Sequence, residues 1–363
     1  MKKLLSGTTA LVAAGMLASG AQAADPISIG VGGYFHAGVS TVSQDMDQNT
    51  RTYGFDREAE IIFSGSTTLD NGLSVGVNVQ LEAETSGDQI DESFMWISGA
   101  FGQVRGGSFD GAMNVMGVYA PSAAQGLYGV VFPTGTSDIA GAALVGEGGF
   151  GLGPDYDAAK VAWYSPTVGG ARIGVSFTPE GSTRGSSADD DANNDRSTNT
   201  AHAVSGASEQ SEIIAVGGNW SGDFGGASVS VGAGYASASA ELSGAEDQVE
   251  WIVGARASMD SISVGGNYSV DNNGLAGNNE RSTITVGATY GMGPMTYGVT
   301  YAMTTREQGA GNADLDSSGL SVAANWSLGG GLTVYGEVQF WDIELASGTN
   351  EATAALIGTT VRF

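Results

Sequence analysis

The strongest constraint on the fold is an alternation of apolar and polar residues with a period of two. From Leu73 to Glu84, leucine, valine and alanine occupy every odd position, while serine, glycine, asparagine, glutamine and glutamate occupy the even ones. Successive side chains of a strand point to opposite faces, so this segment has one apolar and one polar face. The pattern recurs over 283–290, 295–304, 332–340 and 353–363. The chain is therefore predicted to be all-β.

About sixteen such segments follow one another, and bacterial membrane barrels have an even number of strands. The predicted strands span 27–43, 55–69, 73–85, 90–101, 103–109, 159–166, 171–179, 211–221, 227–242, 248–259, 261–272, 280–292, 295–307, 319–328, 332–345 and 353–363. Short turns rich in Asn-Gly and Gly-Gly, which favour tight hairpins, alternate with long connections. The long ones are roughly 44–54, 86–89, 110–158, 180–210, 243–247, 273–279, 308–318 and 346–352.

The hydrophobic residues also point to a membrane. After the first 23 residues, no apolar run reaches the ~18 residues of a transmembrane helix, so a membrane-spanning chain of this kind must be a closed barrel. Outward-facing aromatic residues fall into two groups, one near the short turns and one toward the long loops. Two such belts are typical of the membrane interfaces of a barrel.

Both ends of the chain suggest export. Lys2 and Lys3 precede an apolar run and a small-residue cleavage site at Ala21-Gln22-Ala23, which predicts a signal peptide over 1–23 and a barrel domain over 24–363. The alternating last segment ends at the aromatic Phe363. The formal net charge is −26, and it becomes −28 without the two leader lysines.

So acidic a surface repels nucleic acid. It suits cations or divalent ions bridging to anionic lipid, or it keeps an exported chain soluble in transit; these readings stay open. The absence of cysteine is compatible with export. The segment 90–101 breaks the alternation, because Phe94 to Ile97 are apolar on both faces. It is either a strand buried against an inserted loop or a neighbouring subunit, or no strand at all.

The chain resembles the trimeric general porins of Gram-negative bacteria. The residues that carry the resemblance are Leu69-Asp70-Asn71-Gly72-Leu73, Gln80-Leu81-Glu82, the run from Ser98 to Gly107 (SGAFGQVRGG), Asp110-Gly111-Ala112 and the final Phe363. The resemblance implies that the third long loop, 110–158, folds into the barrel and narrows it. It also implies a homotrimer in outer-membrane lipid and lipopolysaccharide, with Phe363 read by the insertion machinery.

Residues lining such a channel select by charge and bore. Alternation and the resemblance give a set of pore-lining candidates: Arg105, Lys160, Arg172, Asp110, Asp138, Glu147, Asp155, Asp157, Glu58, Glu60, Glu82 and Glu84. The acids on the second and third strands depart from the family, where a basic cluster is expected, and a merely solvated lumen is the alternative interpretation.

Enzymatic chemistry has little basis in the sequence. The only histidines are His36 and His202, and neither has neighbours that suggest a catalytic triad. The acidic run with Asp189, Asp191, Asn193 and Asp195 resembles a calcium loop only weakly, since the expected Gly and Glu are Asn194 and Thr200. No cofactor is predicted, and loosely bound Ca²⁺ on acidic loops stays open.

The sequence thus predicts an outer-membrane channel for passive diffusion of ions and small hydrophilic solutes, moderately selective for cations. The alternatives are a channel specific for a sugar or an anion on the same barrel, and a barrel without transport function, such as an adhesin or an enzyme.

Overall fold

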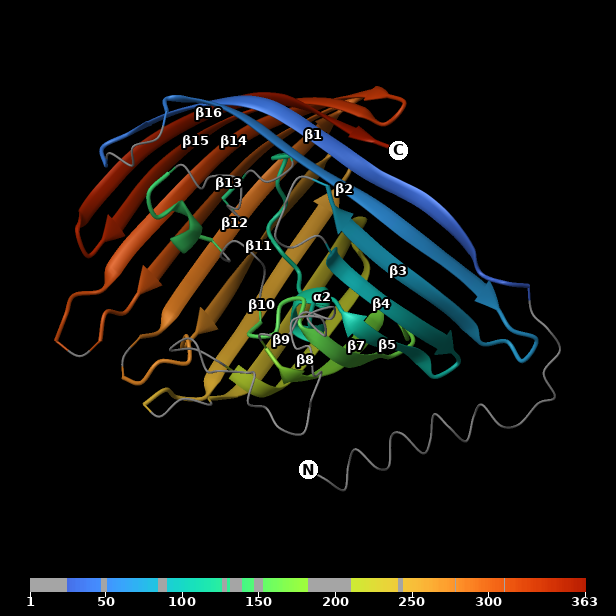
Figure 1. Ribbon diagram of the computed structural model, residues 1–363. Coiled ribbons are helices and arrows are strands. Elements are labelled where there is room, and N and C mark those ends of the chain that lie inside the picture. The colour runs from blue at the N-terminus through green and yellow to red at the C-terminus, as the bar shows by residue number, and fades with distance from the viewer. Residues whose placement is uncertain are drawn as a thin grey trace.

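The computed structural model describes residues 25–46, 51–83, 90–125, 129–130, 139–146, 153–181, 210–240, 244–277, 279–309 and 311–363. In this part of the chain, sixteen antiparallel strands close into one barrel, in which each strand pairs with its neighbours in sequence and β1 pairs with β16 (Figure 1). The prediction of a sixteen-stranded antiparallel barrel is confirmed. The predicted leader 1–23 lies outside the described residues and stays a prediction.

The strands are, in chain order, β1 Ser28–Gln44, β2 Tyr53–Thr68, β3 Ser74–Glu82, β4 Ile90–Gly99, β5 Gly102–Ser108, β6 Ala159–Tyr164, β7 Ala171–Glu180, β8 Gln210–Phe224, β9 Ala227–Ala240, β10 Gln248–Met259, β11 Ile262–Asp271, β12 Arg281–Met292, β13 Met295–Arg306, β14 Leu315–Gly329, β15 Leu332–Leu345 and β16 Gly348–Arg362. Each corresponds to one predicted segment, including the ambiguous 90–101.

The largest difference from the prediction concerns the connection 346–352. It is a two-residue turn, because β16 begins at Gly348 and its first residues pair with the end of β15. The polar residues around Asn350 show no apolar–polar alternation, so the sequence does not predict this extension of the strand. The buried Asn350 amide donates to the Ala140 carbonyl in the long loop (3.1 Å) and to Gln44 Oε1 (3.0 Å). Partners from distant segments therefore stabilise a stretch that has no alternation of its own.

The outer face of the wall is apolar and exposed. Valine, isoleucine and leucine side chains on nearly every strand lie on the outside, including Val31, Val253, Val299 and Ile357. Exposed aromatic residues also lie at both ends of the wall: Phe101, Tyr290, Tyr297, Trp326 and Phe363 at the short-turn end, and Tyr235, Tyr268, Tyr301 and Phe340 toward the long loops. This is the surface that lipid requires of a membrane barrel. Within the described residues, no helix has the length and apolar character to cross a membrane.

Backbone pairing at the seam between β1 and β16 closes the barrel. The two strands pair in register from Tyr34 and Arg362 to Gln44 and Ala352. One residue further, Gly33 and Phe363 exchange both backbone hydrogen bonds, at 3.0 and 3.1 Å. A side chain at Gly33 would meet the Phe363 ring at 3.2 Å, so the terminal aromatic ring lies over this glycine.

The long loop between β5 and β6 lies inside the barrel, as expected. It carries the short helix α2 (Ala112–Val115) and the 3-10 turn η2 (Ala142–Leu144), and α2 contacts β7, β8 and β9 (Figure 1). Val130, Ile139 and Ala142 of the loop form a buried cluster with Trp341 and Ile343 of β15. The loop therefore crosses the lumen and packs on walls that lie far apart around the barrel.

A track of glycines on the inner wall makes this close packing possible. A Cβ atom at any of these glycines would meet loop atoms: Gly217, Gly232, Gly234, Gly254, Gly287 and Gly298. At Gly254 it would overlap the Val118 carbonyl oxygen, and at Gly298 it would come within 2.7 Å of Ala123 Cβ. The loop backbone thus occupies space that side chains fill elsewhere.

We expect Gly254→Ala to displace the loop at Val118. Overpacking of a well-packed site costs about 1–3 kcal/mol, so the folded barrel should unfold at lower denaturant concentration. Denaturant titration followed by circular dichroism measures the shift. Gly106→Ala in β5 is the control, because a Cβ there has nothing within 4 Å. Equal stability of the two variants would contradict the packing argument.

Candidate functional site

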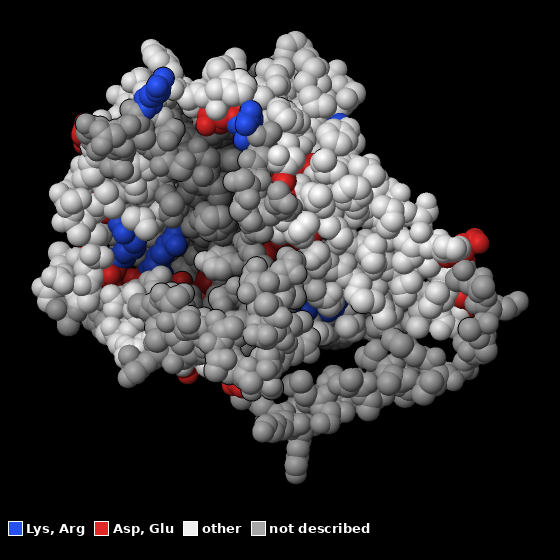
Figure 2. All heavy atoms as spheres, in the orientation of Figure 1, with Lys and Arg blue, Asp and Glu red and all other residues white. Residues whose placement is uncertain are grey.

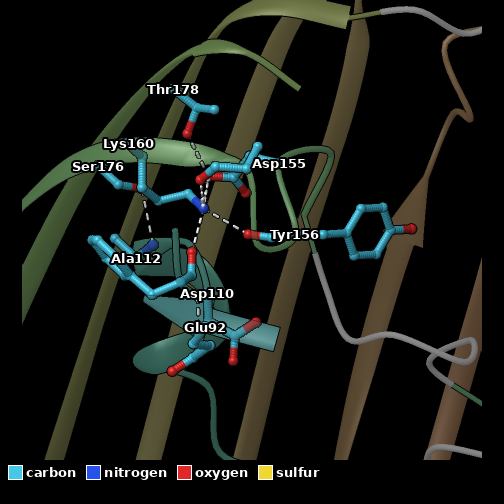
Figure 3. Close-up of polar contacts among 10 residues, drawn as sticks. Glu92, Asp110, Ala112, Asp155, Tyr156, Lys160, Ser176 and Thr178 are labelled. Carbon is cyan, nitrogen blue, oxygen red and sulfur yellow. Dashed lines mark hydrogen bonds and ion pairs between the residues drawn. The ribbon is translucent and has the colours of Figure 1, made fainter. Parts of the chain in front are cut away.

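The two ends of the lumen loop meet at one buried lysine. Lys160, at the start of β6, directs its ammonium group to the carbonyl oxygen of Phe109, where the loop begins, and to those of Tyr156 and Ala158 (both 2.6 Å), where it ends (Figure 3). The residue is only 3% exposed. Lys160 therefore has three carbonyl partners and a structural position, which differs from the water-facing one that alternation predicts.

Asp155 is the buried counter-ion of this lysine. Its Oδ2 lies 3.8 Å from Lys160 Nζ and accepts a hydrogen bond from Thr178 Oγ1 of β7 (2.8 Å). Burial raises the pKa of the Asp155 carboxyl, and Lys160 and the Thr178 hydroxyl oppose the shift. Next to it, Ser176 Oγ accepts from the backbone N–H of Ala112 (2.9 Å). We call Lys160, Asp155, Thr178 and Ser176 the loop-root clamp.

Asp110 is partly exposed and lies next to the loop-root clamp (Figure 3). Its backbone N–H donates to Glu92 Oε1 (3.4 Å), which connects the loop root to β4. Burial raises the pKa of the Asp110 carboxyl, while a hydrogen bond from Asn114 and the charge of Lys160 oppose the shift.

The arginine side of the lumen consists of Arg105 on β5 and Arg172 on β7. Their guanidinium carbons lie 4.9 and 5.1 Å from the centroid of the same ring, that of the buried Tyr164. Both side chains are partly exposed. Both candidates thus lie against one aromatic ring, that of Tyr164, an arrangement that the sequence does not predict.

The acidic side is built on β2 and β3. Glu60 pairs in register with both Tyr34 of β1 and Glu82 of β3, so these side chains share the inner face. The Tyr34 hydroxyl donates to Glu58 Oε1. Glu58, Glu60 and Glu82 therefore lie close together on one wall, as predicted.

Two further acids, Asp91 and Glu92, escape the sequence analysis. The register between β3 and β4 shifts between Val79 and Leu81, which marks a bulge and interrupts the alternation there. Glu92 accepts from Gln80 Nε2 (2.7 Å) as well as from the loop root. The same strand directs Phe94 onto Phe109 of the loop, with ring centroids 5.2 Å apart. Of the alternatives for 90–101, the structure thus shows a strand that packs against the inserted loop.

Other inward-facing basic residues are turned to backbone carbonyls. Arg256 donates to the Tyr119 carbonyl (2.6 Å), and Arg281 to that of Gly146 (2.6 Å). In the same way, Asn267 Oδ1 accepts a hydrogen bond from the backbone N–H of Ala120 (3.1 Å), and these contacts together hold the loop against the wall. The polar inner face thus serves to anchor the loop.

The remaining predicted residues have mixed positions. Asp157 is partly exposed at the end of the loop. Asp138, Glu147 and Glu84 lie outside the described residues, as do Asp189, Asp191, Asn193 and Asp195, so their roles stay predictions. His36 faces inward as expected and is buried. Its Nδ1 and Nε2 lie 3.0 and 2.7 Å from the hydroxyls of Thr360 and Tyr335.

The arrangement suits selection by size and charge. Figure 2 shows blue basic and red acidic side chains around a recess on one face, while most of the flank at the right is uncharged. A loop anchored at its root and along the wall narrows the lumen, and ionisable groups of both signs border the loop root.

Comparison with known proteins gives the same picture. The family model described as Gram-negative porin matches residues 7–343. No curated protein sequence matches the chain significantly. Among solved structures, the anion-selective porin from Comamonas acidovorans is 17% identical with a TM-score of 0.62. The match covers 93% of this chain and 100% of that porin.

Two further structures share the fold. The trimer form of OmpT, an outer membrane protein of Vibrio cholerae, is 14% identical with a TM-score of 0.63, and a mutant porin of Rh. blastica is 19% identical with a TM-score of 0.55. Each match covers 93% of this chain and 100% of the other protein. With a family model matching most of its length and the closed barrel described above, this chain belongs to the Gram-negative porins of the bacterial outer membrane.

Proposed function

We propose that this porin is a homotrimeric diffusion channel that passes ions and small hydrophilic solutes and moderately prefers cations. The observation that carries the proposal is the loop held inside a barrel with an apolar outer face and a polar lumen. Such a loop leaves a narrow aqueous path through the barrel, which favours transport as the function.

The loop-root clamp gives the loop a fixed position at its root. One ammonium group joins carbonyls from both loop ends, and its burial excludes competition from water. Gly254 and the other wall glycines let the first part of the loop, residues 112–123, pack closely against the wall. The bore should therefore be set by the loop and be constant in time.

The cation preference follows from fixed charge. The chain has 39 acidic and 13 basic residues, and Glu58, Glu60 and Glu82 form an acidic wall. Fixed charges of one sign concentrate counter-ions in a narrow bore. Arg105 and Arg172 oppose this, which makes the preference moderate.

This cation preference gives a testable prediction. Under a KCl gradient, the zero-current potential in a planar bilayer should have the sign of potassium selectivity. It should decline with salt, because the Debye length falls from ~30 Å at 0.01 M to ~10 Å at 0.1 M. Glu60→Gln with Glu82→Gln should reduce the potential, whereas Glu351→Gln, on the exposed outer end of β16, should not. A chloride-selective sign at low salt would refute the proposal.

Asp110 adds a pH dependence to the same recording. Since its pKa is raised, the carboxyl takes up a proton at higher pH than an ordinary Asp, whose pKa is ~3.9. The cation preference should thus fall as the pH is lowered from neutral through this raised pKa. Asp110→Asn should start from a lower preference and lose less of it. Identical pH profiles would exclude Asp110 from the conduction path.

A further prediction concerns the bore of the channel. Lys160→Met removes three carbonyl contacts at the loop root, so the released loop should give a larger and noisier single-channel conductance. The single variant also leaves Asp155 buried without its counter-ion, which costs about 3–5 kcal/mol in such pairs. Lys160→Met with Asp155→Asn removes that charge and should recover stability while keeping the larger conductance. Wild-type conductance in both folded variants would contradict the role of the clamp.

The last prediction of this kind concerns assembly. We infer that Phe363 acts in insertion, since its ring and backbone lie at the seam that closes the barrel and outside the lumen. Phe363→Ala should lower the amount of protein in the outer membrane, measured by immunoblot of membrane fractions. Conductance per inserted channel should be unchanged. Tyr297→Ala, an exposed aromatic on the same end of the wall, is the control. Normal insertion of the Phe363 variant would disprove this role.

A further inference from the structure

A row of acidic side chains lies on the inner wall where β1, β2 and β3 pair. Tyr34 of β1, Glu60 of β2 and Glu82 of β3 are in register with one another, and Glu58 lies two residues before Glu60 on the same face. Paired side chains of neighbouring strands have Cβ atoms about 4.5–5.5 Å apart, and residues two apart on a strand are about 6.6 Å apart. We call Tyr34, Glu58, Glu60 and Glu82 the acidic strip.

Glu60 is the buried floor of the acidic strip. The residue is only 7% exposed, and its Oε1 atom is buried without a hydrogen-bond partner among the described residues. A buried carboxylate oxygen without a donor costs free energy, because it has lost its hydration and gained no partner in return. Tyr34, Glu58 and Glu82 are partly exposed, so the strip opens to the lumen. The site therefore calls for a donor that enters from the lumen.

The charge of the strip points to a cation as this donor. Within the described part of the chain, no ion pair joins Glu58 or Glu60 to a lysine or an arginine. The Tyr34 hydroxyl donates to Glu58 Oε1, which orients this carboxylate without neutralising it. Arg57 precedes Glu58 in β2 and is exposed, and alternation along the strand directs it to the opposite face.

The spacing of the carboxylates distinguishes between kinds of cation. A metal ion needs several ligands that converge on one point. Over the ranges that the structure describes, no group of three or more acidic or histidine side chains has that geometry. The carboxylates of the strip instead follow one another along the wall. An organic cation with two ammonium groups fits such a row, because each ammonium can donate to a separate carboxylate.

We propose that the acidic strip is a binding station for small organic diammonium ions that pass through the channel. One ammonium group donates to Glu60 and Glu82 across the paired strands, and the other donates to Glu58. The Tyr34 hydroxyl holds the Glu58 carboxylate in place. The station rests on the proposed channel function, and it adds to the general cation preference a preference for one chemical class.

The test uses putrescine, a linear diammonium ion, in single-channel recordings in KCl. Putrescine should lower the K⁺ current of the wild-type channel saturably. Butylamine has the same carbon chain and one ammonium group, so it should need an about tenfold higher concentration, the equivalent of one lost charged hydrogen bond. Mg²⁺ carries the same charge as putrescine and should also need a higher concentration. Equal half-effective concentrations of Mg²⁺ and putrescine would show that charge alone acts, and would overturn the station.

Two variants that keep the charge separate the station from the field of the wall. Glu60→Asp shortens one ligand, and Tyr34→Phe removes the hydroxyl that holds Glu58. Each should keep the zero-current potential in a KCl gradient and raise the half-effective putrescine concentration about tenfold. Glu351→Gln, at the exposed outer end of β16, is the control and should leave the putrescine effect unchanged. Equal putrescine effects in wild type and in both strip variants would contradict the proposal.

The same recordings separate failure of the station from failure of the channel. A normal KCl conductance with no saturable putrescine effect would overturn the station and leave the channel function standing. Absence of KCl conductance in the wild-type protein would overturn the channel itself.

Discussion

The structure depends on one constraint, the pairing of every backbone polar group in a wall that faces lipid. An unpaired N–H or C=O costs several kcal/mol in hydrocarbon, so a sheet can cross a membrane only when it has no edge. The seam between β1 and β16 removes the last edge, and the exchange of hydrogen bonds between Gly33 and Phe363 extends it to the end of the chain. Closure then fixes the two faces: apolar side chains outside and polar side chains in the lumen.

The inserted loop uses the polar inner face that closure creates. Its backbone groups need partners inside the barrel, and inward-facing side chains such as Arg256, Arg281 and Asn267 supply them. Glycines at the contact points remove the side chains that would keep the loop away from the wall. The lumen wall therefore has two tasks, to face the aqueous path on one side of the barrel and to hold the loop on the other.

Lys160 and Arg105 show how the same charge serves these two tasks. The ammonium of Lys160 is a compact donor that three carbonyls at the loop root surround, so it is buried and structural. The guanidinium of Arg105 is planar, and aromatic rings can cover its faces while its edge stays available. Exchanging the two residue types would leave the loop root without a compact donor and the lumen without a planar one.

The sequence by itself determined most of the strands and their faces, because a period of two is a local property that a strand shows within ten residues. The place of the long loop inside the barrel was an expectation from the family resemblance. It also identified Arg105, Arg172, Glu58, Glu60 and Glu82 as inward-facing. Only the tertiary structure decided the burial of Lys160 and Asp155, the extension of β16 through Asn350 and the bulge that brings Glu92 to the loop root. Each of these depends on contacts with a loop that is distant along the chain, and such contacts leave no periodic signal in the sequence.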